Sequence, residues 1–409
     1  MVHVQVRLCA VIFLSLMFAG CGSLSSTQPG SNQPAGSPPP GSNPTPTGSS
    51  FVAADFPGAD CGAKIRAADT AAGNQSATIE VTAACGTAWT TQVVIGPSHT
   101  LLVEDATYQM TKTVLLHDGA CVVGQNATLA ITKPVDIISN ADVANSNLCV
   151  KTITLSAAGL TGGISRGVYF KNVNGFTISG VNLESMVTHG VFIDDGSNNG
   201  QIVNNNCNGV IQGSCFLAGN APGFATVSNM NISNNTASNI NAANGVFVIG
   251  SKNGVPTNNI TINNNVIKCA RDTSIEIGDG AQSVSASGNQ ITTCAAGSTG
   301  VIVRSAKHIT VENNSVSPSP AATNMIGIFI WNKQGDSEPF QDVTIDHNTV
   351  TGFNGLTSSG ISWSSFVANS SNLSITNNTA TGNTNNFFAR TNNIINLVFT
   401  GNSDPTFGH

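Results

Sequence analysis

The stretch Gly245–Cys269, GVFVIGSKNGVPTNNITINNNVIKC, contains two phrases that recur along the second half of the chain. The first is a small residue followed by a short apolar strand, as in Gly245-Val-Phe-Val. Further copies begin at Gly167, Gly190, Ser274, Gly300, Gly327 and Gly360. The starts are about 23 to 33 residues apart, and one interval of about 55 contains a weaker copy at Cys215-Phe-Leu-Ala, so the sequence predicts a stacked array of repeats.

The second phrase is a β-branched strand that ends in asparagines and is followed by another short strand. It occurs at Ile202, Ile232, Ile262, Val311, Ile345 and Ile375. Asparagine tolerates the left-handed backbone of a tight bend, and its amide can bond to the copy in the next repeat. No amphipathic helical pattern separates the strands, which argues against leucine-rich or α/β repeats. We therefore predict an all-β fold, a single-stranded right-handed parallel β-helix with coils about 4.8 Å apart.

Composition supports one long solenoid and argues against a nucleic-acid partner. Of the 409 residues only 9% are charged, 42 are glycine, and the net charge is -6. This suits a stack with apolar residues inside and Ser, Thr and Asn outside, which we expect over residues 51–409. A chain of this charge is not a generally basic nucleic-acid binder.

The N-terminal segment reads as an export signal followed by a tether. Residues 1–21 contain Arg7 and an apolar run that is too short to span a bilayer. The sequence Phe18-Ala-Gly-Cys resembles the lipoprotein box of bacteria, which implies lipidation of Cys21; an ordinary secretory signal is the alternative. Residues 22–50 are rich in Gly, Ser and Pro and are predicted to be a disordered tether. These features predict an exported protein, lipid-anchored to the bacterial cell envelope at the outer membrane or cell surface.

Eight cysteines remain after Cys21, an even number that in an exported protein favours disulfides over metal sites. Cys269 and Cys294 occupy matching places in consecutive coils, at a separation that a disulfide can bridge. We predict the pairs Cys61–Cys85, Cys121–Cys149, Cys207–Cys215 and Cys269–Cys294. Reduced buried thiols remain the alternative for the last two of these pairs.

The beginning of the folded body carries a family resemblance. Ile65, Ala68 and Ala72 fall on one helical face, so this segment is predicted to be a helix that caps the first coil. The phrase Gly58-Ala59-Asp60, the Ala-rich helix and the strand beginning at Thr78 resemble the pectate-lyase-like β-helix superfamily over residues 55–402. That superfamily includes lyases, hydrolases, epimerases, phage tail spikes and non-catalytic surface proteins, so the resemblance implies the fold and leaves the activity open. Residues 132–147 break the spacing and are predicted to be a loop that leaves the stack.

Alternation along the first phrase predicts one apolar row pointing outward. Val191 and Ile193, like their counterparts in other coils, should point inward. The outward positions are Tyr169, Phe192, Leu217, Phe247, Glu276, Ile302 and Phe329, followed by Lys171, Asp194, Ile249, Arg304 and Trp331. Loops could bury this row; alternatively Phe329, Trp331 and Tyr169 would form a sugar-stacking groove, or the row would bind a partner protein.

Charged residues cluster on two consecutive coils. The cluster comprises Arg271, Asp272, Glu276, Asp279, Arg304, Lys307 and His308. We take Asp272, Glu276, Asp279 and Arg304 as candidate catalytic residues and Lys307 and Arg271 as candidate substrate-binding residues. The placement of Asp272 resembles that of the acidic pair of polygalacturonases, although only one acid is present and the Gly-His-Gly and Arg-x-Lys phrases are absent. A surface ion-pair network is the alternative interpretation.

Two chemistries fit the charged cluster. Glycoside hydrolysis needs two carboxyl groups that flank the bond, as Asp272 with Glu276 or Glu276 with Asp279 would. A lyase needs a base and a cation next to the uronate carboxylate, with Arg304 or Lys307, or calcium held by the three carboxylates, in the latter role. A lesser pair, Asp194 and Asp195 beside Glu184 and His189, is either a second site or a solvated turn.

The sequence thus predicts a tethered β-helix that acts on extracellular polysaccharide as a lyase or hydrolase of a uronate-type polymer. The alternative is a non-catalytic surface β-helix that binds glycan or protein.

Overall fold

A computed structural model describes residues 49–219, 225–250, 254–320, 322–332, 338–391, 393–404 and 408. The predicted signal peptide, Cys21 and nearly all of the predicted tether lie outside these ranges. Within them, no helix is long and apolar enough to cross a membrane.

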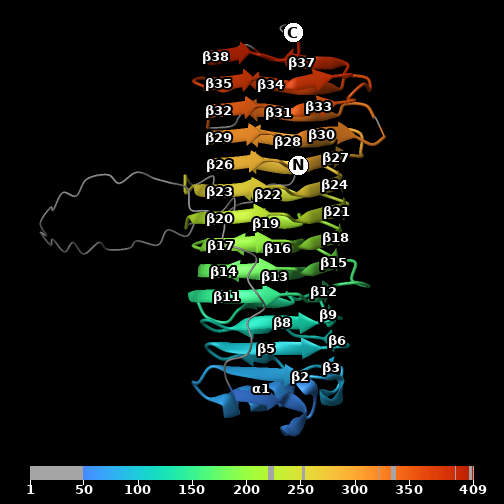
Figure 1. Cartoon of the computed structure of the whole chain (residues 1–409), viewed down its shortest axis with the longest axis vertical. Coiled ribbons are helices and arrows are strands. Elements are labelled where there is room, and N and C mark those ends of the chain that lie inside the picture. The colour runs from blue at the N-terminus through green and yellow to red at the C-terminus, as the bar shows by residue number, and fades with distance from the viewer. Residues whose placement is uncertain are drawn as a thin grey trace, which may run out of the picture. The chain divides into compact units, whose positions relative to one another are not determined.

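Three parallel sheets run along the folded body, and each complete coil contributes one strand to each sheet, whereas the end strands β1 and β38 add to one sheet only (Figure 1). Sheet A contains 14 strands: β1 (Ser49–Val52), β2 (Ala77–Val81), β5 (His99–Glu104), β8 (Cys121–Gln125), β11 (Asn145–Lys151), β14 (Val173–Ser179), β17 (Asn198–Val203), β20 (Val227–Ser233), β23 (Thr257–Asn263), β26 (Ala281–Ser287), β29 (Lys307–Glu312), β32 (Gln341–Asp346), β35 (Ser371–Thr376) and β38 (Ile395–Thr400).

Sheets B and C contain 12 strands each. Sheet B consists of β3 (Ala88–Trp89), β6 (Thr107–Met110), β9 (Thr128–Ile131), β12 (Thr154–Ser156), β15 (Asn182–Met186), β18 (Asn206–Val210), β21 (Thr236–Ile240), β24 (Val266–Ala270), β27 (Gln290–Thr293), β30 (Ser315–Pro318), β33 (Thr349–Thr351) and β36 (Thr379–Thr381). Sheet C consists of β4 (Val93–Ile95), β7 (Val114–Leu116), β10 (Ile138–Asn140), β13 (Arg166–Lys171), β16 (His189–Asp194), β19 (Phe216–Ala218), β22 (Val246–Ile249), β25 (Thr273–Gly278), β28 (Thr299–Arg304), β31 (Ile326–Asn332), β34 (Ser359–Ser365) and β37 (Asn385–Ala389).

The predicted cap is confirmed as helix α1 (Cys61–Ala72), beside the short 3-10 helices Ala53–Asp55 and Ala83–Cys85. The Asp60 side chain accepts a hydrogen bond from the Ala63 amide at 2.8 Å, which satisfies a free N–H of the first turn. Ile65, Ala68 and Ala72 are buried. The helix therefore covers the apolar end of the first coil.

The recurring first phrase forms the strands of sheet C from β13 to β34, the weak copy at Cys215 included. Its inward residues are fully buried, among them Val191, Ile193, Val246 and Val248 at 0% exposure. Alternate side chains of a strand point to opposite faces, so the residues between them form the outer surface of sheet C.

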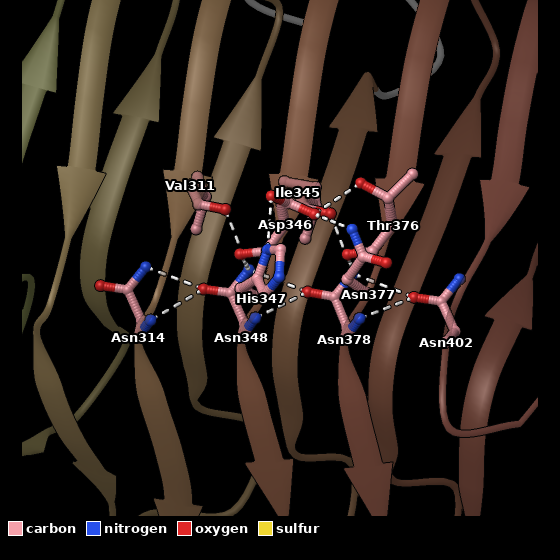
Figure 2. Close-up of polar contacts among 10 residues, drawn as sticks. All are labelled: Val311, Asn314, Ile345, Asp346, His347, Asn348, Thr376, Asn377, Asn378 and Asn402. Carbon is pink, nitrogen blue, oxygen red and sulfur yellow. Dashed lines mark hydrogen bonds and ion pairs between the residues drawn. The ribbon is translucent and has the colours of Figure 1, made fainter.

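The predicted asparagine corner is confirmed between sheets A and B, as a ladder of buried amides (Figure 2). The ladder residues are Asn205, Asn235, Asn265, Asn289, Asn314, Asn348, Asn378 and Asn402. Each of the first seven donates its side-chain N–H to the Oδ1 of the next Asn and also to a carbonyl of sheet A, as Asn314 does to Asn348 at 2.9 Å and to Ala286 at 3.0 Å. The preceding residue supplies the left-handed bend, for example Asn264 with φ 56°.

All four predicted disulfides are present, with Cα–Cα distances of 5.1 Å for Cys61–Cys85, 4.5 Å for Cys121–Cys149, 5.9 Å for Cys207–Cys215 and 4.7 Å for Cys269–Cys294. Two details of the sequence interpretation are wrong. The β-helix includes Ser49 and Ser50, which pair with β2, so the predicted boundary at residue 50 is too late. Residues 132–147 do not form one loop outside the stack, because β10 pairs with both β7 and β13, and β11 begins at Asn145.

Candidate functional site

The outward row of sheet C is aligned as the sequence predicts. Pairing runs from Tyr169 to Phe192, Leu217, Phe247, Glu276, Ile302 and Phe329 in consecutive strands. Leu217, Glu276 and Phe329 are buried at 7%, 7% and 8% exposure, whereas the others keep an accessible edge. The row is thus a partly covered apolar surface, interrupted by one carboxylate.

Arg304 joins two of the predicted catalytic carboxylates. Its Nη2 lies 3.2 Å from Glu276 and 2.8 Å from Asp279, and its Nε donates to Asp279 at 3.2 Å. These contacts arise because Gly278 of β25 lies opposite Arg304 of β28 in the sheet. Glu276 is two residues before Gly278 and Asp279 is the residue after it, so the Arg304 side chain reaches both carboxylates. The structure therefore brings three of the four predicted catalytic residues together.

Glu276 is the most enclosed member of this group. Its second carboxylate oxygen accepts a hydrogen bond from Asn244 Nδ2 at 2.9 Å. Burial raises the pKa of Glu276 above its ordinary value, although Arg304 and Asn244 act in the opposite direction. A carboxyl group with a raised pKa is suited to donate a proton.

Replacing Glu276 with Gln is expected to flatten the pH dependence of the unfolding free energy. Because the pKa of Glu276 is raised above 4.5 in the folded protein, the folded state binds the proton more tightly than the unfolded chain. The stability that Glu276 contributes is therefore full below pH 4.5 and is lost as the pH rises through the raised pKa. Urea unfolding of the wild type and of Glu276→Gln, in acidic and in neutral buffer, measures this. An equal fall in the unfolding free energy of both proteins from acidic to neutral pH would contradict the prediction.

The other predicted members lie around this group without joining it. Asp272 is exposed just before β25 and acts on Glu276 only through its charge, which contributes to the raised pKa of Glu276. Arg271 donates to the Asn241 carbonyl at 3.3 Å. Lys307 begins a strand of sheet A and pairs with Glu338 at 3.1 Å, while His308 pairs with Asp342 at 3.0 Å. Part of the charged cluster is thus engaged in local surface contacts.

Among the residues that the structure describes, no three His, Cys, Asp or Glu side chains are grouped as metal ligands. Glu276 and Asp279, two of the carboxylates considered for calcium, hold Arg304 instead. Calcium at this place would require Arg304 to move.

A second cluster, four coils nearer the N-terminus, was not recognised as a unit from the sequence. Arg166 binds Asp136 through Nε and Nη2, both at 2.7 Å, and its guanidinium lies 3.4 Å from the centroid of the Tyr169 ring. The Tyr169 hydroxyl donates to Asp194 Oδ2 at 2.7 Å. Burial, followed by the contact with Asp194, raises the pKa of Tyr169, so this tyrosine is protonated in the free protein.

His189 completes this second cluster. Its ring packs 5.2 Å from Phe192, which itself packs 5.4 Å from Tyr169. The Ser214 amide donates to His189 Nδ1 at 3.1 Å, so a neutral imidazole carries its proton on Nε2. Burial lowers the pKa of His189 to about 4, which keeps the ring neutral near neutral pH.

Asp194 and Asp195 are buried at 4% and 6% exposure, so the interpretation of a solvated turn is wrong. Asp195 lies 3.7 Å from the exposed Lys171. Glu184, the other acid considered with them, belongs to sheet B, where it accepts a hydrogen bond from Asn182 at 2.7 Å. The sequence did contain one signal: Arg166, His189 and Asn244 all directly precede the small residue of the first phrase.

The aromatic residues predicted to form one sugar-stacking groove lie at two ends of the outward row. Phe329 and Trp331 stack with ring centroids 5.5 Å apart and planes 14° apart. Tyr169 lies six strands away in sheet C, roughly 29 Å along the axis at about 4.8 Å per coil. Any ligand that contacts both ends is therefore an extended polymer.

Comparison with known proteins gives structural neighbours but no sequence match. No protein-family model and no curated protein sequence matches the chain. The A-module of the mannuronan C-5 epimerase AlgE6 of Azotobacter vinelandii superposes with a TM-score of 0.57 at 14% identity, over 87% of this chain and 100% of that module. The chain is a right-handed parallel β-helix.

Two further solved structures share this right-handed parallel β-helix, the fold expected for the pectate-lyase-like superfamily. The catalytic domain of a GH87 α-1,3-glucanase in complex with nigerose has a TM-score of 0.57 at 13% identity, over 90% of this chain and 70% of that one. The periplasmic alginate epimerase AlgG has a TM-score of 0.52 at 12% identity, over 80% of this chain and 73% of that one. At these identities the likeness defines the fold.

Proposed function

We propose that this β-helix acts on a uronate-type polysaccharide that lies along the outer face of sheet C, by removing the proton at C5 beside the uronate carboxylate. The observation that carries the proposal is the Tyr169 hydroxyl held by Asp194 at 2.7 Å, with Arg166 and the neutral His189 beside it. Two of the structural neighbours are named as epimerases of mannuronan or alginate, which supports a uronate polymer as the substrate class.

Each side chain of the cluster has a defined part in this reaction. As the Tyr169 oxygen accepts the C5 proton, its own proton passes to Asp194. The electron pair of the C–H bond moves toward the carboxylate, where the Nε2–H of His189 and the Nη1–H of Arg166 stabilise the developing charge. Reprotonation on the other face gives an epimer, whereas loss of the substituent at C4 gives an unsaturated chain end.

The proposal includes export and lipidation at Cys21. Four disulfides in the described residues favour an oxidising compartment, and one structural neighbour is named as periplasmic. Labelling of the protein in bacterial cells with a clickable fatty acid, with Cys21→Ser as the control, tests the anchor.

The test of the reaction is incubation of the full chain with polymannuronate, polyguluronate and polygalacturonate in deuterated water, with and without calcium. Nuclear magnetic resonance should detect deuterium at C5, accompanied by epimers or by unsaturated ends. Failure of every polymer to exchange at C5 would contradict the proposal. Retained binding without exchange would then leave the non-catalytic glycan-binding protein.

Hydrolysis at the predicted Asp272, Glu276 and Asp279 is the second candidate, favoured by the raised pKa of Glu276. It requires Arg304 to release at least one carboxylate. New reducing ends without exchange at C5, abolished by Glu276→Gln, would identify this reaction instead.

A further inference from the structure

Arg390 lies at an outward position of the last coils of sheet C. It follows β37, and its backbone N–H donates to the Trp363 carbonyl at 2.8 Å, which continues the pairing of β37 with β34. Farther along the same sheet, Trp331 of β31 lies opposite Arg304 of β28 on one side and opposite Ser364 of β34 on the other. Arg390 therefore extends the line of outward residues that contains Arg304 and Trp331.

The Arg390 side chain reaches back over two coils to the aromatic pair. Its guanidinium carbon lies 5.0 Å from the centroid of the Phe329 ring, and Phe329 stacks on Trp331. The side chain must cross β34 to do so, and the outward Ser362 and Ser364 of that strand are buried at 0% and 1% exposure. Phe329 is covered, whereas Trp331 keeps an accessible edge.

The surroundings of the Arg390 guanidinium differ from those of Arg166 and Arg304, the other two arginines on sheet C. Arg166 and Arg304 each bind carboxylates through two nitrogens, but within the described ranges no acidic side chain forms an ion pair with Arg390. The residue is accessible to solvent, yet burial of part of its side chain lowers the pKa of the guanidinium. A partly desolvated cation without a counter-ion is poised to bind an anion.

We propose that Arg390, Phe329 and Trp331 form a remote subsite for one acidic sugar residue, whose carboxylate or sulfate binds the Arg390 guanidinium while its ring lies against Trp331. Guanidinium binds such anions through two parallel hydrogen bonds, and aromatic faces suit the C–H surfaces of sugars. The subsite deepens the proposed function, because it lies on the same outer face as Tyr169. The aromatic pair of the subsite lies six strands of sheet C from Tyr169, roughly 29 Å at about 4.8 Å per coil.

The experiment measures binding in a background that does not turn over. The full chain carrying Tyr169→Phe is titrated with polymannuronate, with the same polymer after reduction of its carboxylates, and with a sulfated galactan. Adding Arg390→Gln should weaken polymannuronate binding roughly 10- to 100-fold, the range expected for a lost charged hydrogen bond, and leave binding of the reduced polymer unchanged. An effect on the sulfated galactan alone would support the subsite with sulfate as its anion.

Arg66→Gln is the matched control, since Arg66 is an exposed arginine of the cap helix and the change in net charge is the same. An equal loss in this control, unchanged affinity in Arg390→Gln, or no binding of either acidic polymer would overturn the subsite. If Arg390→Gln proves unstable by thermal melting, Arg390→Lys decides the question, because it keeps the charge but lacks the planar fork; full affinity in that variant would also overturn it. Because binding is measured without turnover, the two proposals can fail separately. If the wild-type protein shows no exchange at C5 but its affinity for the polymer depends on Arg390, the proposed reaction is wrong and the subsite stands.

Discussion

Tyr169→Phe is expected to abolish exchange at C5, with a loss of at least about a hundredfold in turnover and little change in binding of the polymer. General acid–base catalysis contributes roughly 10²- to 10⁴-fold, and the substitution removes the only oxygen that Tyr169 brings to Asp194. The ring itself stays, so the packing against Phe192 and the guanidinium of Arg166 is kept. Initial rates and dissociation constants measured on the same polymer separate the two effects.

The chain offers a matched control, because Tyr108 is its only other tyrosine. Tyr108 is fully buried near the cap, where its hydroxyl donates to the carbonyls of Val81 and Glu104. Tyr108→Phe should therefore lower stability by about 1 kcal/mol and leave the rate unchanged. If the Tyr169→Phe protein retains the wild-type rate, Tyr169 is not the acid–base group.

The largest effect on stability is expected from Asn265→Ala, at about 3 kcal/mol or more in the free energy of unfolding. Asn265 Oδ1 accepts from the backbone and side-chain N–H of Asn235, both at 3.0 Å, and its Nδ2 donates to the Ile232 carbonyl at 2.9 Å. Alanine leaves all three of these buried groups without that partner, and each unsatisfied group costs roughly 1–3 kcal/mol. Denaturant unfolding followed by circular dichroism gives the value.

Asn206→Ala is the matched control for the ladder. Asn206 directly follows a ladder asparagine but is exposed, and its side-chain amide donates to Asn182 Oδ1 at 2.7 Å. Its loss should cost less than about 0.5 kcal/mol. Comparable costs at Asn206 and Asn265 would mean that buried amides do not stabilise this corner.

The fold could be predicted from the sequence because its determinants repeat. The same phrases at Gly167, Gly245 and Gly327 reveal both the period and the inward positions, and the matched places of Cys269 and Cys294 reveal a disulfide. The contact between Glu276 and Arg304 could be predicted for the same reason, since both belong to regular coils.

The second cluster could not be predicted as a unit because it joins regular coils to an irregular one. Asp136 lies in the segment that breaks the spacing, so nothing in the sequence placed it beside Arg166. Asp194 accepts a hydrogen bond from the Tyr169 hydroxyl of the preceding coil, a contact that depends on the coil-to-coil offset. Arg390 lies one coil beyond the last copy of the first phrase, at Gly360, and its reach over two coils depends on its side-chain conformation.

The four disulfides are unevenly distributed along the β-helix. The last cysteine of the sequence is Cys294, so every covalent cross-link lies before residue 295, and the coils from there to the C-terminus rely on neighbour contacts alone. In a solenoid each coil contacts only its neighbours, so local opening can start at one end. Native-state hydrogen exchange should therefore be fastest in the Arg390 coils and slowest near α1, and a sugar bound at Arg390 would slow that fraying from the unlinked end.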